Sequence, residues 1–262
     1  AAEIAQALSG QNDARRRIAE QIEAEAIDQA ERAGMTEPGR RAIVLASPDW
    51  HPGVVGIVCS RLVERYHRPV VLLCADDDGT CRGSARSVDG YNLHDALCQC
   101  AEPLETFGGH AMAAGLRVAP GKLDAFAELL IAHANAAIAP EDLVARFAYD
   151  TDARLDEFTE AAAHDLERLG PFGRDNPRPR LRLLNAQLFE PARRMGSSGA
   201  HLTLRLKQQG RIVRCVAWKK GDIADRLPRG ARVHALVTPK INEWNGRRSV
   251  ECEIADLTLA DT

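Results

Sequence analysis

The spacing of hydrophobic residues predicts one long helix at the start of the chain. From residue 4 to residue 33, isolated apolar side chains stand among Ala, Glu, Gln and Arg, which favour helix. Gly34 ends this pattern, and Pro38-Gly39 marks a linker. The apolar stripe is thin and carries Arg15-Arg16-Arg17. We therefore expect the helix to bridge domains rather than to pack in a core.

Strand-like and helix-like patterns alternate between residues 40 and 137. Short apolar runs predict buried strands at 42–46 and 69–75, and a third strand is expected at 80–88. Further elements are expected as helices at 54–66, 92–100 and 122–136, and as a brief strand at 116–118. The alternation indicates an α/β domain.

The pattern changes after residue 140. A strand is expected at 147–155 and a helix at 157–169, followed by a connector at 171–179 that its prolines keep irregular. Five strand-like runs come next, at 181–190, 201–208, 211–218, 231–239 and 248–257, with a short helix at 220–227. A helix between the third and fourth of five strands is the order of an OB barrel. Asn245-Gly246 predicts a hairpin turn between the last two strands.

These patterns divide the chain into a connecting helix over 1–36, an α/β domain over 37–140, and an all-β OB domain with its connector over 141–262. A length of 262 residues is enough for two domains. No apolar run is long enough to span a membrane, and the first residues lack the features of a secretory signal. Because it has no initiator methionine, we expect the chain to be a piece of a longer protein.

The cysteines do not predict a metal site. All seven are scattered, mostly within apolar or alternating runs, as is typical of reduced residues in a cytoplasmic protein. The closest pair, Cys98-Gln99-Cys100, lacks the second cluster that a zinc site uses. The sequence has no D-H-H motif, and Asp76–Asp78 is interpreted as a solvated turn because Gly79 follows it, so no metal ligands are expected in this chain.

Charge is distributed unevenly along the chain. Residues 171–250 hold eighteen Lys and Arg against five Asp and Glu, which gives this segment a net charge of +13. Because the net charge of the whole chain is −3, the remaining residues carry −16. So basic a block in an acidic chain favours a polyanionic partner. The alternative is a solvated basic face without a ligand.

A glycine–histidine stretch at 108–115 is the first candidate for chemistry. Gly108 and Gly109 let the backbone approach a ligand, and His110 adds a donor whose charge switches near neutral pH. We expect the small residues after His110 to begin a helix, whose first-turn N–H groups would favour an anion. The alternative is a helix entered through a glycine turn, with a packed histidine.

Two further stretches of the α/β domain are candidates for ligand contact. In 83–87, Ser84 and Arg86 share one face of a predicted strand, where a hydroxyl and a guanidinium match the oxygens of a phosphate, and Ser87 follows. Trp50-His51 begins a strand-to-helix turn, the place where α/β sheets bind ligands. The alternatives are an exposed polar strand face for the first stretch and a packed indole for the second.

In the OB domain, cationic and aromatic residues fit a groove for a single strand of nucleic acid, in which cations follow the backbone and rings stack on bases. These candidates are Arg193, Arg194, Arg205, Lys207, Lys219, Lys220, Trp244, Arg247 and Arg248. Against this interpretation, the domain is poor in aromatic residues, and Trp218 could belong to the barrel core.

Taken together, these stretches resemble the RecJ family of bacterial exonucleases specific for single-stranded DNA, in the DHH phosphoesterase superfamily. The resemblance is carried by Trp50–Ile57, Arg68-Pro69, Gly83–Ser87, Phe107–Gly115, and Pro171-Phe172-Gly173 with Asn176-Pro177. Residues 12–17 resemble the start of the interdomain helix of that family. Asp175 departs from the family pattern, which tends to have a small residue before Asn-Pro.

The resemblance implies a DHH-associated domain and an OB domain, the C-terminal part of an enzyme that degrades single-stranded DNA from the 5′ end in recombination and repair. Mn²⁺ or Mg²⁺ would be bound by an N-terminal DHH domain that is absent here. Ser84 and Arg86 would hold the 5′ phosphate, His110 would contact the scissile phosphate, and the OB barrel would thread the strand. This chain alone would not cleave DNA.

The implied partners are single-stranded DNA, the DHH domain of the same protein, a single-strand-binding protein and a helicase, without a membrane. Two other functions stay open at this point. One is a binding module for single-stranded nucleic acid that has no catalytic share. The other is a phosphoesterase of the same superfamily that acts on short oligonucleotides, against which the OB domain argues.

Overall fold

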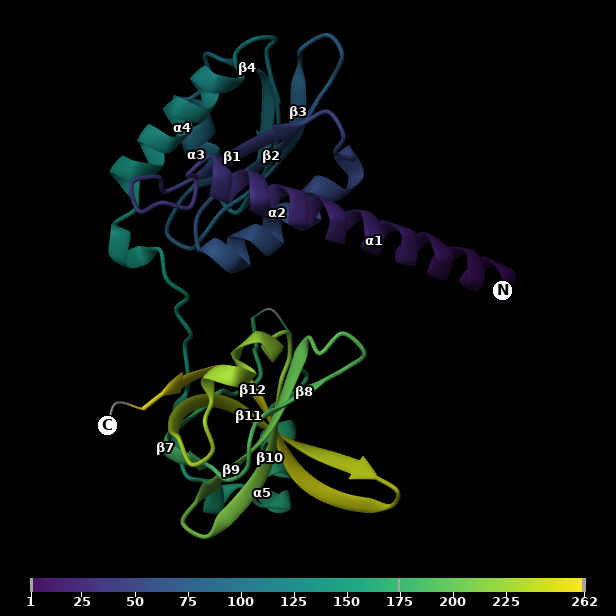
Figure 1. The fold of residues 1–262 in the computed structure, drawn as a ribbon, viewed down its shortest axis with the longest axis vertical. Coiled ribbons are helices and arrows are strands. Elements are labelled where there is room, and N and C mark those ends of the chain that lie inside the picture. The colour runs from purple at the N-terminus through teal and green to yellow at the C-terminus, as the bar shows by residue number, and fades with distance from the viewer. Residues whose placement is uncertain (1, 174, 261–262) are drawn as a thin grey trace. The chain divides into compact units, whose positions relative to one another are not determined.

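The computed structural model describes residues 2–173 and 175–260, which form two compact units, Ala1–Ala145 and Arg146–Thr262 (Figure 1). Each unit has its own sheet and its own core. An α/β unit followed by a β-rich unit confirms the predicted fold class. None of the helices in the described part is both long enough and apolar enough to cross a membrane.

A five-stranded sheet with the order β1-β2-β3-β5-β4 forms the centre of the first unit. Its strands are β1 (Ile43–Ser47), β2 (Val70–Ala75), β3 (Cys81–Arg86), β4 (Leu104–Gly109) and β5 (Ala113–Val118). The first two are parallel, and the other pairings are antiparallel. The apolar runs of β1 and β2 are buried along most of their length, as expected of strands covered on both faces.

Helices cover the two faces of this sheet unequally. On one face α1 (Ala2–Arg32) and α2 (Pro52–Tyr66) pack on β1 and β2, and on the other lie α3 (Leu93–Gln99) and α4 (Leu123–Ala137) (Figure 1). The core under α1 and α2 takes no described residue from β4 or β5. One face of these two strands is therefore left without a helix.

The second half of α1 belongs to a core, so the expectation that this helix bridges domains rather than packs was wrong for that half. Ala19, Ile22, Ala26 and Ala30 are buried against α2 and β1. Their spacing is helical, but three of the four are alanines, which a search for large apolar residues passes over. A connecting role for the whole helix stays a prediction.

The glycine–histidine stretch forms a β-hairpin, and the helix expected after His110 is wrong. β4 runs to Gly109 and β5 begins at Ala113, while the His110 N–H donates to the Ala113 carbonyl at 2.8 Å. Gly109 has φ +149°, and a Cβ there would lie 2.3 Å from the Ala113 oxygen. Pairing with β5 sets the backbone conformation of Gly108 and Gly109. The stretch therefore has no helix dipole that could favour an anion.

The second unit contains the five expected strands, as β7 (Leu181–Leu188), β9 (His201–Gln208), β10 (Arg211–Ala217), β11 (Arg232–Trp244) and β12 (Arg247–Leu259). Their order is β7-β11-β12-β10-β9, and a further pairing of β7 with β9 joins the two ends. β10 and β12 are parallel, while the other pairings in this ring are antiparallel. This topology is that of an OB fold.

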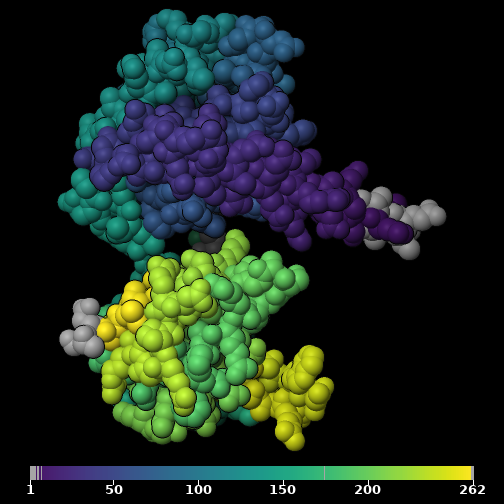
Figure 2. All heavy atoms as spheres, viewed as in Figure 1, coloured from purple at the N-terminus to yellow at the C-terminus, as the bar shows by residue number. Residues whose placement is uncertain are grey.

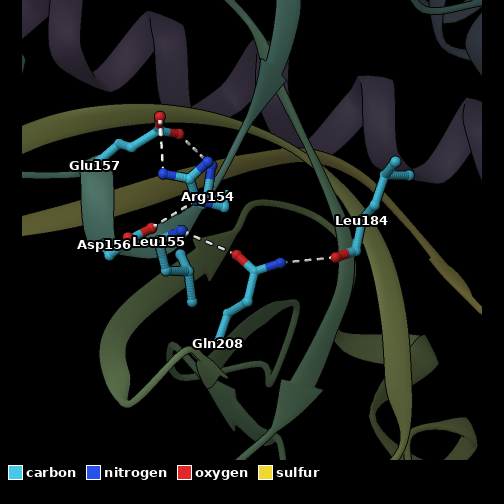
Figure 3. A network of polar contacts seen from close by, with 6 residues as sticks. All are labelled: Arg154, Leu155, Asp156, Glu157, Leu184 and Gln208. Carbon is cyan, nitrogen blue, oxygen red and sulfur yellow. Dashed lines mark hydrogen bonds and ion pairs between the residues drawn. The ribbon is translucent and has the colours of Figure 1, made fainter.

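Shorter elements complete the unit. They are β6 (Thr151–Ala153), β8 (Arg193–Met195), α5 (Glu160–Glu167) and two 3₁₀ helices, Leu155–Glu157 and Gly221–Arg226, the second of which lies where a short helix was expected. Gln208 fixes the first 3₁₀ helix on the barrel, because its amide accepts from the Leu155 N–H at 3.0 Å and donates to the Leu184 carbonyl at 2.8 Å (Figure 3). The segment before the barrel is therefore a folded part of this unit.

Two residues of the sequence motifs have structural roles. Arg68 is buried, and its Nη1 donates to the carbonyl oxygens of Met35, Glu37 and Arg40, so it holds the linker after α1. Asn176 donates to the carbonyls of Leu169 and Pro171 and so closes the proline connector.

Candidate nucleic-acid interface

The face of β5 and β4 that is left without a helix, together with β3 next to α2, carries a patch of small residues beside a hydroxyl and a guanidinium. Strand register places Ser84 opposite Gly115, and Gly115 opposite Gly108. In the neighbouring row of residues on the same face, Arg86 lies opposite Ala113. We call the surface made by these residues and His110 the shelf.

His110 extends the row of the shelf that holds Arg86. It follows the last residue of β4, and its backbone bonds to Ala113, the partner of Arg86. Two strand spacings, or about 10 Å, therefore separate the backbones of Arg86 and His110. His110 is exposed and Arg86 is half-buried. The structure thus brings Ser84 and Arg86 on β3 close to Gly108 and His110 at the end of β4, with β5 between them.

Two glycines of the shelf have no steric reason to be glycine. A Cβ on Gly108 would meet nothing within 4 Å, and one on Gly115 would come no closer than 3.8 Å to another atom. By contrast, a Cβ on Gly83 would lie 2.0 Å from the Leu72 oxygen, so the fold itself requires that glycine. The space above Gly108 and Gly115 is therefore available to something other than the chain.

Charge on the shelf is concentrated at Arg86. Two other arginines of the same face lie one row beyond Ser84 and are already paired, Arg82 with Asp76 at 3.3 Å and Arg117 with Glu105 at 3.0 Å. In the described part of the chain no carboxylate pairs with Arg86, whose Nη1 donates to the Ala85 carbonyl at 2.9 Å. A guanidinium with unused donors is suited to a phosphate.

Helix α2 fixes the two polar side chains of β3 from the side. A Cβ on Gly56 would lie 3.1 Å from Arg86 Nη2 and 3.3 Å from Ser84 Oγ, so these groups rest against the helix backbone. Beneath them, the buried Cys59 thiol donates to the Ser84 carbonyl at 3.2 Å. Burial raises the pKa of this thiol to about 12, which keeps it neutral.

The structure does not support ligand contact by two of the predicted residues. Trp50 is buried, and its indole N–H donates to Glu25 at 3.1 Å, so the alternative of a packed indole is correct. Ser87 is also buried, and its hydroxyl donates to the Tyr91 carbonyl at 2.6 Å. His51 is exposed, but its Nδ1 accepts from the Gly53 N–H at 3.1 Å and caps α2.

In the second unit, the outer surface of β9 and β10 is the basic one. Leu202, Leu204 and Leu206 point into the barrel core, so the alternate residues Arg205 and Lys207 face outward. Further outward-facing residues lie on the neighbouring strands: on β10, Arg214 stands opposite Arg205 and Ile212 opposite Lys207, and on β8, Arg193 stands opposite Thr203. These are the second and third barrel strands, where OB folds bind oligonucleotides.

Two aromatic rings accompany these cations. Trp218 follows β10 and is 50% exposed, so it is not a core residue. Its ring contacts that of His201 edge-on at 4.9 Å, and His201 Nδ1 accepts from the Lys219 N–H at 3.0 Å. Phe189 is exposed as well and lies 5.7 Å from Lys207 Nζ.

Several predicted cations form ion pairs at the surface. Arg194 contacts Asp225 at 2.7 Å, Lys220 contacts Asp256 at 2.8 Å, and Arg205 contacts Glu190 at 3.5 Å. Such exposed pairs contribute only ~0–1 kcal/mol, so a phosphate can compete for the cations. The described residues include no carboxylate partner for Lys207 or Arg193.

The remaining predicted residues lie on a projecting hairpin. β11 and β12 pair as far as Trp244 and Arg247, and the turn at Asn245-Gly246 has positive φ at both residues, as predicted. The hairpin projects from the rest of the unit (Figure 2). Trp244 is 73% exposed, and Arg247 and Arg248 are exposed beside it. β12 pairs with β10 over Glu251–Glu253, so Arg247 and Arg248 lie beyond that pairing and form a second basic surface of this unit.

Sequence reasoning missed several residues of these surfaces. Gly115 and Ala113 drew no attention as partners of Ser84 and Arg86, because strand register is not visible in one sequence. Arg214 was not selected either, although it stands opposite Arg205. The alternation of Arg214 with inward Val213 and Cys215 was the signal that could have found it.

The described residues do not form a metal centre. Within residues 2–173 and 175–260, no three His, Cys, Asp or Glu side chains gather to hold an ion. The polar groups of the shelf are a hydroxyl, a guanidinium and one imidazole, a set unlike the oxygen ligands that Mg²⁺ and Mn²⁺ prefer. The described residues of the shelf are therefore not a ligand set that fits such a metal.

Models of known protein families match both units of the chain, one model for each unit. A model of the DHHA1 domain matches residues 39–136, and a model of the RecJ OB domain matches residues 149–256. The chain belongs to the RecJ family. The single-stranded-DNA-specific exonuclease RecJ of Bacillus subtilis is 32% identical over 262 residues, a match that covers the whole chain and 33% of that relative.

Other RecJ proteins give the same result. RecJ of Escherichia coli K12 is 32% identical over 270 residues, covering 97% of this chain and 44% of the relative. The crystal structure of RecJ in complex with Mn²⁺ from Thermus thermophilus has a TM-score of 0.78 and 33% identity, and the match covers 100% of this chain and 37% of that one. This chain thus spans about a third of B. subtilis RecJ and corresponds to the C-terminal part of RecJ.

Proposed function

We propose that this chain supplies the phosphate-binding and strand-binding part of an exonuclease that degrades single-stranded DNA from the 5′ end. The observation that carries the proposal is the shelf, where Gly108 and Gly115 leave space that the fold does not need, beside an Arg86 without a carboxylate partner among the described residues. RecJ relatives are named as exonucleases specific for single-stranded DNA.

On the shelf, we assign Ser84 and Arg86 to the terminal 5′ phosphate. The Ser84 hydroxyl and the Arg86 guanidinium rest against Gly56, so both are positioned before the ligand binds. His110 contacts the scissile phosphate and donates to the oxygen on which negative charge develops. The space over Gly108 and Gly115 lets the phosphate approach the strands closely.

The metal ions of the complete enzyme, Mn²⁺ or Mg²⁺, belong in this proposal to an N-terminal DHH domain, which would activate the attacking water. The residues of this chain bind and orient the DNA. The OB unit holds the rest of the strand through Arg193, Arg205, Lys207 and Arg214, with Trp218 stacking on a base. We infer that the complete enzyme acts in recombination and repair in the cytoplasm, together with a single-strand-binding protein and a helicase.

One experiment separates this proposal from a binding module without a catalytic share, which the OB unit by itself also fits. In the complete enzyme, His110→Ala is expected to lower kcat about 10²–10³-fold with little change in single-strand affinity. Unchanged turnover of His110→Ala and Arg86→Ala would favour the binding module. The 262-residue chain is expected to bind single-stranded DNA and not to cleave it with Mn²⁺, and cleavage that His110→Ala abolishes would contradict this expectation.

A further inference from the structure

A basic pocket lies in the OB unit, on the outer surface of β11 and β12. It has a volume of about 180 Å³ and is lined by three cations, Arg178, Arg180 and Lys240, together with Glu253 and Thr238. These residues come from the proline connector and the last two strands, so the pocket is separate from the β9–β10 surface.

Only one of the three cations retains its charge uncompensated. Lys240 is paired with Glu253, and Arg178 contacts Glu167 at 2.5 Å outside the pocket. No described carboxylate pairs with the guanidinium of Arg180. The pocket therefore has a net positive charge centred on this residue.

Both the backbone and the side chain of Arg180 are held in place. Asp150 exchanges two hydrogen bonds of 2.8 Å with the backbone of Arg180, one through its own N–H and one through its carboxylate. The guanidinium lies over the ring of Phe147 at 6.0 Å, within the range of a cation–π contact. A positioned guanidinium loses less entropy when it binds an anion than a mobile one.

The flanking arginines show by contrast what is unusual about Arg180. Arg178 stacks on Phe172 at 4.5 Å, and Arg182 stacks on Tyr149 at 4.4 Å, so three alternate arginines each meet a ring. Arg182 donates to both oxygens of Asp152, at 2.7 and 3.0 Å. The outer two arginines thus pair with carboxylates as well as with rings, while Arg180 has no carboxylate partner among the described residues.

Strand register connects this pocket to the β9–β10 surface. Arg205 lies opposite Arg214, Arg214 opposite Glu251, and Glu251 opposite Lys240, which forms one row across four strands. Two strand spacings, or about 10 Å, separate Arg214 from Lys240. A strand of nucleic acid on β9 and β10 can therefore reach the pocket within a few nucleotides.

We propose that the pocket at Arg180 binds a backbone phosphate of the same single strand that β9 and β10 hold. This inference rests on the proposed function, since it requires single-stranded DNA on the OB unit. Arg180 donates to the phosphate oxygens, and Thr238 holds the connector against β11 by donating to the Pro179 carbonyl at 3.0 Å. The DNA footprint then extends beyond the second and third barrel strands.

The test measures binding of the 262-residue chain to labelled oligothymidylates, from about 4 to about 16 nucleotides long, over a range of salt concentrations. Arg180→Gln is expected to leave the shortest oligonucleotides unaffected. For the longest it should lower affinity about three- to tenfold and reduce the slope of log K against log salt by ~0.7, the value for one phosphate contact. Arg182→Gln is the matched control, because it removes a neighbouring stacked arginine outside the pocket, and it should leave the slope unchanged.

Lys207→Gln, on β9, distinguishes failure of this inference from failure of the proposed function. If Lys207→Gln lowers the salt slope at every length and Arg180→Gln does so at none, the pocket proposal is overturned and the OB surface stands. An equal loss of slope in Arg182→Gln would overturn it too. If the chain binds no single-stranded DNA at all, both proposals are overturned.

Discussion

Gly108 lies directly opposite Gly115 in the β4–β5 ladder, and neither glycine is required by the packing around it. Alanine at either position is therefore expected to change the free energy of unfolding by no more than ~1 kcal/mol, and it can increase it. The added methyl group would stand where the phosphate is expected. In the complete enzyme we predict a large loss of exonuclease activity for Gly108→Ala and Gly115→Ala, with unfolding followed by denaturant titration.

Gly83→Ala is the control for these two variants. A methyl group there would collide with the Leu72 carbonyl, so this variant should lose stability as well as activity. Normal activity in Gly108→Ala and Gly115→Ala would show that nothing approaches the shelf closely.

Arg86 is expected to distinguish a 5′ phosphate from a 5′ hydroxyl. Hydrogen bonds to charged groups contribute ~1.5–3 kcal/mol, so Arg86→Gln should reduce the preference for a 5′-phosphorylated oligonucleotide about tenfold to 150-fold. Arg82→Gln is the matched control, because Arg82 lies on the same strand and is paired with Asp76. The measurement is the ratio of the two affinities in the complete enzyme, and equal ratios in both variants would count against the assignment.

Trp218 should stack on a base of the bound strand. Removal of one such ring costs ~1–3 kcal/mol, so Trp218→Ala is expected to weaken binding of oligothymidylate to the chain by about five- to 150-fold. Trp218→Phe keeps an aromatic face and should restore most of the affinity. If the alanine variant binds as tightly as the parent chain, the β9–β10 surface is not the binding surface.

The thiols provide a test of the core that does not depend on DNA. Among the seven cysteines, Cys98 is exposed and the others are buried. Burial raises the pKa of Cys59 to about 12 and also raises the pKa values of Cys74, Cys81 and Cys100. A raised pKa makes the reactive thiolate scarcer at any given pH. One thiol, Cys98, should therefore react rapidly near pH 8, with mass spectrometry identifying the site, and rapid labelling of Cys59 would contradict the packing of α2 on β3.

Arg68 should contribute to stability rather than to binding. Its buried guanidinium donates to four carbonyls, three of them through Nη1, so Arg68→Ala leaves these groups without partners and should cost about 3 kcal/mol or more. Thermal unfolding of the first unit should shift to lower temperature, while that of the OB unit stays in place. The comparison with Arg65→Ala, at the exposed end of α2, provides the control.

The predictable part of the fold was the part set by local pattern. The apolar runs of β1 and β2, the alternation in β9 and the Asn245-Gly246 turn each specify their own conformation, so the first strands of the α/β unit and the strand order of the OB unit could be obtained from the sequence. The hairpin at Gly109 could not, because glycine disfavours strands and only pairing with β5 holds it there.

The candidate site was predictable only as a set of residue types. That Ser84 and Arg86 share a face followed from alternation, whereas the burial of Trp50 and Ser87 depends on α1 and on the turn at Tyr91, which are distant or irregular. The ion pair of Arg194 with Asp225 joins residues far apart in the chain. Which cations stay available to a ligand is a property of tertiary contacts, and one sequence does not contain it.

The central claim is that a DNA phosphate binds on the shelf, next to Arg86 and over Gly115. A crystal structure of the complete enzyme with a 5′-phosphorylated single strand tests it most directly. The account predicts the terminal phosphate within hydrogen-bond distance of Ser84 Oγ and the Arg86 guanidinium, and the next phosphate near His110. A terminal phosphate bound elsewhere, with the shelf left to solvent, would contradict it.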